Sequence, residues 1–198
     1  MKRAAVLLAG ILLANSLNAQ EFPKADISVG WTFLLFQPGF RTGTTGLNGW
    51  HASATGRASR RIGITADFAG NYGSPLLTAA TSLGSVRLNS RLTNYTFLFG
   101  PTVTVHNARR TRLFANALFG AGHAKQFLQP ALAGVPVVAF NQTDSSWAAA
   151  AGGGYDLNFT SWIAGRVAFD WVRTNYFHNA QNNARFVTGV VLKLARKS

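Results

Sequence analysis

The stretch Gly49–Tyr72, GWHASATGRASRRIGITADFAGNY, contains two segments of alternating residues joined by a very short connection. In the first segment Trp50 begins a face of apolar and small residues, and His51 begins the opposite, polar face. In the second segment Ile62 begins an apolar face, and Asp67 lies on the polar one. Period-two alternation on both sides of a tight turn predicts a β-hairpin.

The same alternation recurs along the chain and predicts an all-β fold of eight antiparallel strands. We expect these strands at residues 26–36, 49–58, 62–72, 93–105, 113–126, 146–157, 163–174 and 183–194. The connections between them are alternately long (37–48, 73–92, 127–145) and short (59–61, 106–112, 158–162), and the last (175–182) is moderate. Short turns on one side and long loops on the other are typical of an up-and-down barrel that crosses a membrane.

Glycine and proline add local detail to this pattern. Gly100-Pro101 interrupts the fourth expected strand, and we predict a β-bulge there. The Gly152–Gly154 run is not followed by a helix, which argues against a phosphate-binding loop. We interpret these glycines as residues that relieve crowding or permit curvature.

The composition indicates which face of the strands meets lipid. Only 13% of the 198 residues are charged, against about 25% in soluble domains. The polar faces consist mainly of Ser, Thr, Gly, Ala and Asn, which would make a poor exterior for a soluble, lipocalin-like barrel. Aromatic residues cluster near strand ends, as in the girdles of membrane barrels. We therefore predict a transmembrane β-barrel with apolar faces outward and polar faces in the lumen.

The N-terminus has the features of a secretory signal peptide. Met1-Lys2-Arg3 is positively charged, and the apolar run Ala4–Ala14 is too short to span a bilayer as a helix. We expect cleavage after Ala19, with Ser16 as the alternative site. This divides the chain into a signal peptide (1–19) and a barrel domain (20–198), and it predicts Sec-type export.

Several segments carry a resemblance to a known family. They read DISVGWTF (26–33), LNGWHASA (47–54), ITADFAGNYGS (64–74), FLFGP (97–101), FANALFGAGHA (114–124) and AAAGGGYDL (149–157). The chain resembles the OmpA-like eight-stranded outer-membrane barrels, in particular the single-domain "outer membrane protein beta-barrel" type of acidobacteria. The last strand resembles the barrel-assembly signal, with Gly189, Leu192 and Leu194 at its spacing, although Leu194 replaces the usual terminal aromatic residue.

The resemblance implies a location and partners. It implies an integral protein of the bacterial outer membrane that contacts outer-membrane lipids, including lipopolysaccharide, and is inserted by the barrel-assembly machinery. A monomer is expected. The peptidoglycan-binding domain of full-length OmpA proteins is missing, so the resemblance implies no attachment to the cell wall.

Five charged residues are expected to form a network in the lumen. They are Arg57, Asp67, Arg166, Asp170 and Arg185. Arg166 and Asp170 lie four apart on one strand face, and Arg57 is a plausible partner for Asp67. The network could be an ion path, but an eight-stranded barrel is only wide enough for its own side chains, which favours a paired polar plug.

Five arginines are expected in short turns on the periplasmic side. They are Arg60, Arg61, Arg109, Arg110 and Arg112. Each could contact anionic phospholipid headgroups, worth about 1 kcal/mol apiece, or could simply be solvated. Despite a net charge of +13, nucleic-acid binding is not expected, because these clusters lie on separate turns and form no continuous stripe with stacking aromatics.

His51, Ser53 and Asp67 supply the residue types of a hydrolase. The pattern resembles the His-x-Ser arrangement of outer-membrane lipid A deacylases, although no glutamate lies within the barrel to match theirs. Polar filling of the lumen is the simpler interpretation, since Asp67 is expected opposite Ser53 rather than beyond the histidine. We predict a non-enzymatic barrel with a structural or surface-interaction role; a lipid hydrolase and a small-solute pore are the alternatives.

No cofactor or metal site is expected. The chain has no cysteine, and His106, His123 and His178 lack the spacing of metal ligands.

Overall fold

The computed structural model describes residues 25–36, 44–74, 76–81, 84–130 and 140–194. They form β1 (Ala25–Phe36), β2 (Thr45–Arg57), β3 (Ile62–Gly73), β4 (Leu76–Thr81), β5 (Gly84–Asn107), β6 (Thr111–Pro130), β7 (Phe140–Asn158), β8 (Ile163–Thr174), a 3-10 turn η1 (Tyr176–His178) and β9 (Gln181–Leu194). Among these residues no helix is long and apolar enough to cross a bilayer.

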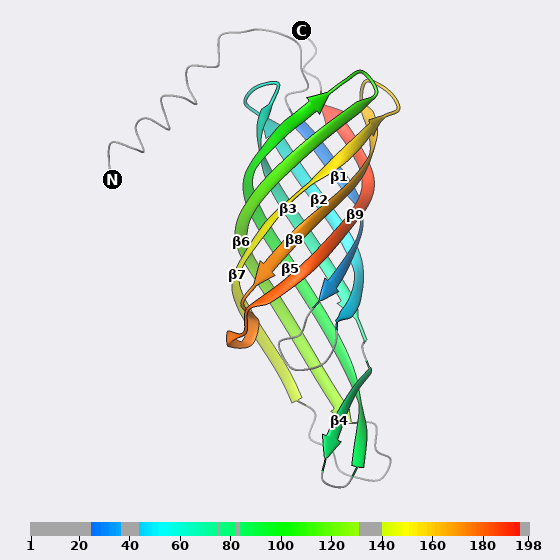
Figure 1. Ribbon diagram of the computed structural model, residues 1–198, viewed down its shortest axis with the longest axis vertical. Helices are drawn as coiled ribbons and strands as arrows, with labels where there is room; N and C mark the ends of the chain where they lie inside the picture. The colour runs from blue at the N-terminus through cyan, green and yellow to red at the C-terminus, as the bar shows by residue number, and fades with distance from the viewer. Residues whose placement is uncertain (1–24, 37–43, 75, 82–83, 131–139, 195–198) are drawn as a thin grey trace, which may run out of the picture.

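The strands close into a barrel. Every pairing is antiparallel, and β3 pairs with β5 while β1 pairs with β9. The cycle β1-β2-β3-β5-β6-β7-β8-β9 therefore returns to β1, and eight strands wind obliquely around a common axis (Figure 1). The predicted all-β, eight-stranded, up-and-down barrel is confirmed.

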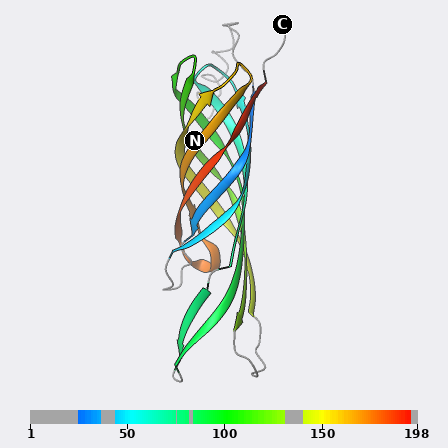
Figure 2. The ribbon, with the colours of Figure 1, turned by 90° about the vertical axis from the view of Figure 1, so that its right-hand side faces the viewer.

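The connections separate the two ends of the barrel. Tight turns join β2 to β3, β5 to β6 and β7 to β8, closed by backbone hydrogen bonds such as Ala58 N–H to Ile62 O (3.0 Å) and Phe159 N–H to Ile163 O (3.1 Å). The start of β1 and the end of β9 lie at this end, because Ala25 pairs with Leu194. The end of β1, the start of β2, β4 and η1 lie at the opposite end, where the expected long loops begin and end (Figures 1 and 2). We call the two ends the short-turn end and the long-loop end.

The interpretation of residues 73–92 as a loop was wrong. β4 pairs with the first residues of β5, from Leu76↔Asn89 to Thr81↔Gly84, and this hairpin projects beyond the barrel (Figure 2). Likewise β2 begins at Thr45 instead of residue 49, and β6 and β7 extend into the expected loop 127–145. The β4–β5 hairpin escaped the sequence pattern because alternation is a signal of one buried face, which a hairpin beyond the barrel does not need. The start of β2 pairs with β1 inside the barrel, but it follows a segment rich in Gly and Thr that indicated a loop.

The predicted bulge at Gly100-Pro101 is also wrong. The β5–β6 register continues unchanged from Phe99↔Phe119 to Thr102↔Asn116 and shifts only between Thr104 and His106. A proline removes one backbone donor but inserts no extra residue, so the ladder keeps its register around it. The extra residue lies nearer the turn, where a shift disturbs fewer pairs.

The barrel is inverted relative to a soluble protein. Its exterior carries large apolar side chains, such as Phe99 (54% exposed) and Phe119 (64%), which pair directly across β5 and β6. The interior holds buried charges, among them Asp67 and Arg185. In soluble domains charged residues are almost never fully buried unless paired, and large apolar residues fill the core.

Glycines in the wall permit close packing. Gly30 and Gly189 pair with each other, and a Cβ on either would meet the backbone of the other's strand, whereas Gly152 lies across from the lumen residue Asp170. A Cβ on Gly152 would lie 2.2 Å from the carbonyl oxygen of Phe169 and 2.4 Å from Asp170 Oδ1. The role in relieving crowding that the sequence suggested for this glycine is confirmed.

Replacing Gly152 with alanine should lower the free energy of unfolding of the barrel by about 1–3 kcal/mol, because the new methyl group overpacks the wall against Asp170. Gly56→Ala is the matched control, since a Cβ there meets nothing within 4 Å. Urea unfolding of both variants in lipid vesicles measures the difference. Equal effects of the two substitutions would contradict the packing argument.

Candidate functional site

One group of buried charges crosses the middle of the lumen. Arg185 on β9 donates to Asp67 Oδ1 on β3 (2.7 Å) and to Asp170 Oδ2 on β8 (2.8 Å). His51 on β2 lies with Nε2 2.7 Å from Asp67 Oδ2. All four side chains are buried, and Arg185 is 2% exposed. We call these residues the central network.

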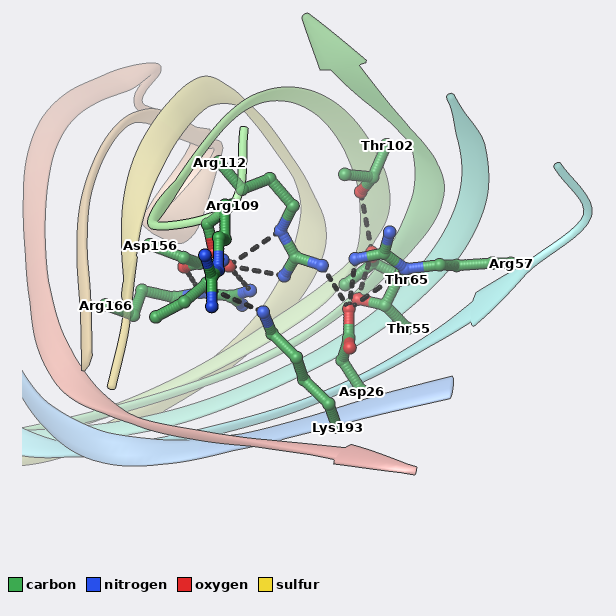
Figure 3. Close-up of polar contacts among 11 residues, drawn as sticks. Asp26, Thr55, Arg57, Thr65, Thr102, Arg109, Arg112, Asp156, Arg166 and Lys193 are labelled. Atoms are coloured by element: carbon green, nitrogen blue, oxygen red, sulfur yellow. Dashed lines mark hydrogen bonds and ion pairs between the residues drawn. The ribbon is translucent and has the colours of Figure 1, made fainter. Parts of the chain in front are cut away.

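A second group lies nearer the short-turn end (Figure 3). Arg112 on β6 joins two carboxylates, because it donates from Nη1 to Asp26 Oδ2 (2.8 Å) and from Nε to Asp156 Oδ2 (2.8 Å). Asp26 also accepts from Nε of Arg57 (3.1 Å). Arg166 donates from Nε to Asp156 Oδ1 (2.8 Å).

Two further contacts complete this group. The Arg166 guanidinium stacks over the Phe114 ring, 4.6 Å from its centroid, which stabilises the cation in a confined space. Lys193 on β9 donates to Asn158 Oδ1, a neutral acceptor. We call Asp26, Arg57, Arg112, Asp156, Arg166 and Lys193 the mouth cluster.

The structure places all five expected lumen residues inside the barrel but pairs them differently. Arg166 bonds to Asp156 instead of Asp170, which bonds to Arg185, and Arg57 bonds to Asp26 instead of Asp67. Four residues along a strand span about 13 Å, whereas residues in register on neighbouring strands are about 5 Å apart. Asp156↔Arg166 and Asp170↔Arg185 are such registered pairs.

Sequence reasoning missed three members of these groups. Asp26 and Asp156 were not considered, and Arg112 was assigned to a turn although it is buried on β6, which begins at Thr111. A signal was present for two of them. Asp26 is two residues from Ser28 and therefore lies on the same strand face, and Arg112 is four residues from Asn116 and likewise shares its face. Ser28 points inward and Asn116 partly inward.

Apolar side chains close the long-loop end of the lumen. Tyr176 of η1 packs against a cluster made by Leu34, Phe36, Leu47, Leu92 and Ala124. Its hydroxyl donates to Asn94 Oδ1 (2.7 Å). Burial, together with the nearby Asp144 carboxylate, raises the pKa of Tyr176, so the hydroxyl stays a neutral donor.

We call Tyr176 and the apolar cluster around it the lid. The backbone of Phe177, next to Tyr176, holds the lid in place. Phe177 has φ 53°, a left-handed conformation that is rare for an aromatic residue. Its N–H donates to the Asp144 carboxylate on β7. The anchored backbone thus holds the Tyr176 ring inside the long-loop end of the barrel.

The hydrolase residues are neighbours, but they form no catalytic chain. Ser53 lies directly across from Asp67, as expected. Asp67 nevertheless also bonds to His51, which corrects the expectation that it would lie nearer Ser53 than the far side of the histidine. Among the described residues the second ring nitrogen, His51 Nδ1, has no hydrogen-bond partner, so the histidine makes no hydrogen bond to the Ser53 hydroxyl. A nucleophile needs that contact to be activated.

Four of the five arginines expected in short turns lie outside the lumen. Arg60, Arg61, Arg109 and Arg110 are exposed at the short-turn end. His106 is exposed near the C-terminal end of β5, and His123 Nδ1 lies 2.7 Å from Ser145 Oγ. The side chain of His178 lies outside the described residues.

Comparison with known proteins identifies the fold. No family model and no curated protein sequence matches the chain. Ail, the attachment invasion locus protein of Yersinia pestis, is 15% identical over 85% of this chain and 97% of its own, with a TM-score of 0.56. Neisserial surface protein A is 9% identical over 86% and 97% (TM-score 0.57), and OprG, an outer membrane protein of Pseudomonas aeruginosa, 10% over 89% and 98% (0.56). The chain has the fold of a small outer-membrane β-barrel.

That fold accounts for the inverted distribution of residues. A closed barrel satisfies all its backbone hydrogen bonds internally, so its outer face can be apolar while its lumen holds polar groups. In this chain the lumen is filled by two ionic groups and one apolar lid. The buried charges of the described residues are therefore paired with one another inside the barrel.

Proposed function

We propose that the chain is a non-enzymatic integral protein of the bacterial outer membrane, with a structural or surface-interaction role at its long-loop end. The observation that carries this proposal is the filled lumen: Arg185 bridges Asp67 and Asp170 in the middle of the barrel, and Tyr176 closes one end. A barrel with a blocked interior and an apolar exterior can contact lipids or other molecules only through its loops and its outer wall.

The outer wall has a feature suited to lipid contact at the long-loop end. Arg91, Lys125, Phe127 and Asn141 line a surface groove beside Thr93, on neighbouring strands β5, β6 and β7. Tyr95, the next outward residue of β5 after Thr93, belongs to the aromatic zone where an interface is expected. Arg91 and Lys125 lie just beyond this zone, where they could bind the phosphate groups of lipopolysaccharide.

The orientation and assembly follow the same proposal. The long-loop end faces outward and the exposed turn arginines face the periplasm, where they can contact anionic phospholipids. The proposal also includes membership of the OmpA-like family and a monomeric state. It further includes a signal peptide cleaved near Ala19, Sec export and insertion by the barrel-assembly machinery. The likeness of Gly189, Leu192 and Leu194 to an assembly signal supports the insertion route.

Hydrolysis has no support in the geometry. Ser53 and His51 are both 5% exposed and point into the lumen, away from the acyl chains that a lipid hydrolase must reach. The His51–Asp67 contact is explained by the need to pair a buried carboxylate. We therefore assign no catalytic residue.

Planar-bilayer recordings test the filled lumen. Purified protein should give no stable single-channel steps, since the central network leaves no water column through the barrel. A variant with Asp67→Ala, Asp170→Ala and Arg185→Ala is the positive comparison, because it removes the side chains that cross the lumen. Large, stable steps from the unmodified protein would favour the small-solute pore instead.

Cysteine labelling tests the orientation, and the chain contains no native cysteine to interfere. Gln142→Cys, exposed at the long-loop end, should react with a membrane-impermeant maleimide on intact cells. Arg60→Cys, exposed in a short turn, should react only after the outer membrane is permeabilised. The reverse pattern would invert the topology, and labelling of both positions in a soluble periplasmic fraction would refute membrane insertion.

A further inference from the structure

A surface groove lies between two of the short turns. The turn after β5 supplies Arg109 and Arg110 to its lining, and the turn after β7 supplies Phe159, Thr160 and Ser161. The two turns are neighbours because β6 and β7 are paired strands. The volume of the groove is about 560 Å³, whereas small-molecule sites span roughly 300–1,000 Å³, so a small ligand or a lipid headgroup fits it. We call it the turn groove.

Asn158, the last residue of β7, fixes the shape of the turn groove. Its backbone N–H donates to the carbonyl oxygen of Arg110 (2.8 Å), and its side-chain Nδ2 donates to the carbonyl oxygen of Arg109 (3.1 Å). Its side-chain oxygen accepts a hydrogen bond from Lys193 of the mouth cluster. One residue therefore ties the two turns together, and both arginines extend from backbone positions that are held in place.

The positive charge of the turn groove is not neutralised by the protein. Arg109 and Arg110 are exposed, and no ion pair among the described residues includes either of them. The described carboxylates at this end, Asp26 and Asp156, are buried and bonded to arginines of the mouth cluster. An anion in the groove therefore meets two guanidinium groups, which bind phosphate oxygens through paired hydrogen bonds.

Hydroxyl groups add neutral donors to the same lining. Thr160 Oγ1 accepts hydrogen bonds from the backbone N–H groups of Ile163 (2.9 Å) and Trp162 (3.3 Å). Because both bonds use the oxygen as an acceptor, the hydroxyl proton remains available for a ligand. Ser161, also a lining residue, is exposed and carries a second hydroxyl. Cationic donors beside neutral ones are a suitable lining for a phosphate group.

The apolar outer wall leads directly to the turn groove. Tyr155 and Leu157 are exposed on the outward face of β7, and Phe159 follows at the same two-residue spacing. The Phe159 ring lies over β8, because a Cβ on Gly165 would be 3.1 Å from it. In the proposed orientation hydrocarbon chains contact this face, and headgroups lie beyond it at the level of the turns. A ligand that matches both surfaces has an anionic head and an apolar tail.

We propose that the turn groove binds one anionic glycerophospholipid of the periplasmic leaflet, with its phosphate between Arg109 and Arg110 and its acyl chains along the outward face of β7. This assignment rests on the proposed membrane location and orientation. It differs from a diffuse attraction by all the turn arginines, because Arg60 and Arg61 are equally exposed but are not among the groove residues. One lipid molecule is therefore held at a defined position on the barrel.

Native mass spectrometry of the full chain, folded in zwitterionic detergent, tests the site with phosphatidylglycerol. The unmodified protein should bind one molecule of this lipid more tightly than any further ones. Phosphatidylcholine has the same phosphodiester but no net charge, and it should bind several-fold more weakly. Soluble glycerol phosphate has no acyl chains and should not displace the lipid at equal concentration. Equal binding of the two lipids, or displacement by glycerol phosphate, would overturn the assignment to an anionic lipid.

Arg109→Gln combined with Arg110→Gln is the decisive variant, and Arg60→Gln combined with Arg61→Gln is its matched control. Each removes two exposed positive charges from one short turn, but only the first changes the turn groove. The groove variant should weaken phosphatidylglycerol binding by roughly tenfold or more, because it loses charge-assisted hydrogen bonds to the phosphate, whereas the control should bind as the unmodified protein does. Equal losses in both variants would indicate diffuse attraction and overturn the site, as would unchanged binding in the groove variant.

A charge-conserving variant and vesicle insertion separate the lipid site from the membrane location. Arg109→Lys combined with Arg110→Lys keeps both charges but loses the paired hydrogen bonds, so its affinity should lie between those of the unmodified protein and the glutamine variant. Insertion of the unmodified protein into phosphatidylcholine vesicles without any binding of phosphatidylglycerol would refute the lipid site, leave the membrane location intact and favour an acidic protein as the occupant. Failure to insert at all would refute the location and the lipid site together.

Discussion

Replacing Arg185 with methionine is expected to lower the free energy of unfolding of the barrel by about 3–5 kcal/mol. Arg185 is the only cation hydrogen-bonded to Asp170 among the described residues, and it also donates to Asp67. Methionine fills similar volume but leaves both carboxylates buried without their guanidinium. The loss of a paired charge partner, more than the loss of packing, produces the effect.

The reference measurement is urea unfolding in lipid vesicles, and two comparison variants separate charge from volume. Arg173→Met removes an arginine from the outward face of β8, where the side chain is exposed, and should change the unfolding free energy by less than about 1 kcal/mol. Combining Arg185→Met with Asp67→Asn and Asp170→Asn removes the unpaired charges and should recover most of the loss. If the triple variant were as unstable as Arg185→Met alone, the ionic explanation would fail.

Replacing Phe119 with arginine is expected to lower the free energy of unfolding in a bilayer by about 2–4 kcal/mol. Phe119 is 64% exposed on the outer wall of β6, across from Phe99 on β5. At this position an arginine would have to leave water and enter hydrocarbon. The prediction depends on the wall being in contact with lipid.

Phe159 provides a matched control with nearly the same exposure. It is 65% exposed but lies in the turn between β7 and β8, outside the strands. Phe159→Arg should therefore alter stability by less than about 0.5 kcal/mol, as surface substitutions usually do. If Phe119→Arg were equally harmless in vesicles, the outer wall would not be immersed in lipid and the proposed location would be wrong.

The sequence predicted the barrel because its strongest signal is local. Residues 49–72 alternate with a period of two, and a single turn pairs Ala58 with Ile62, so the register Ser53↔Asp67 follows directly. The same signal fails for β4 and for the part of β5 that pairs with it, which form a hairpin beyond the barrel. Local alternation reports one buried face, and a strand without one leaves no such pattern.

The candidate site was predictable only in part. Strand parity placed Arg57, Asp67, Arg166, Asp170 and Arg185 in the lumen, as the structure also places them. Parity does not state which strand faces which across the barrel, and it gave no reason to join Arg112 on β6 to Asp26 on β1, 86 residues apart. The lid was likewise invisible, because Tyr176 reaches the lumen from a short turn outside any strand.

The amino-acid sequence by itself determined the eight strands of the barrel, their inward and outward faces and the three short turns, because each of these depends on residues close together in the chain. Closure of the barrel, through pairing of β3 with β5 and of β1 with β9, decided everything else. It brought Arg185 to Asp67, 118 residues away, and gathered four cations around two carboxylates at one end of the lumen. A network of buried charges depends on distances across the barrel, and those distances exist only once the sheet has closed on itself.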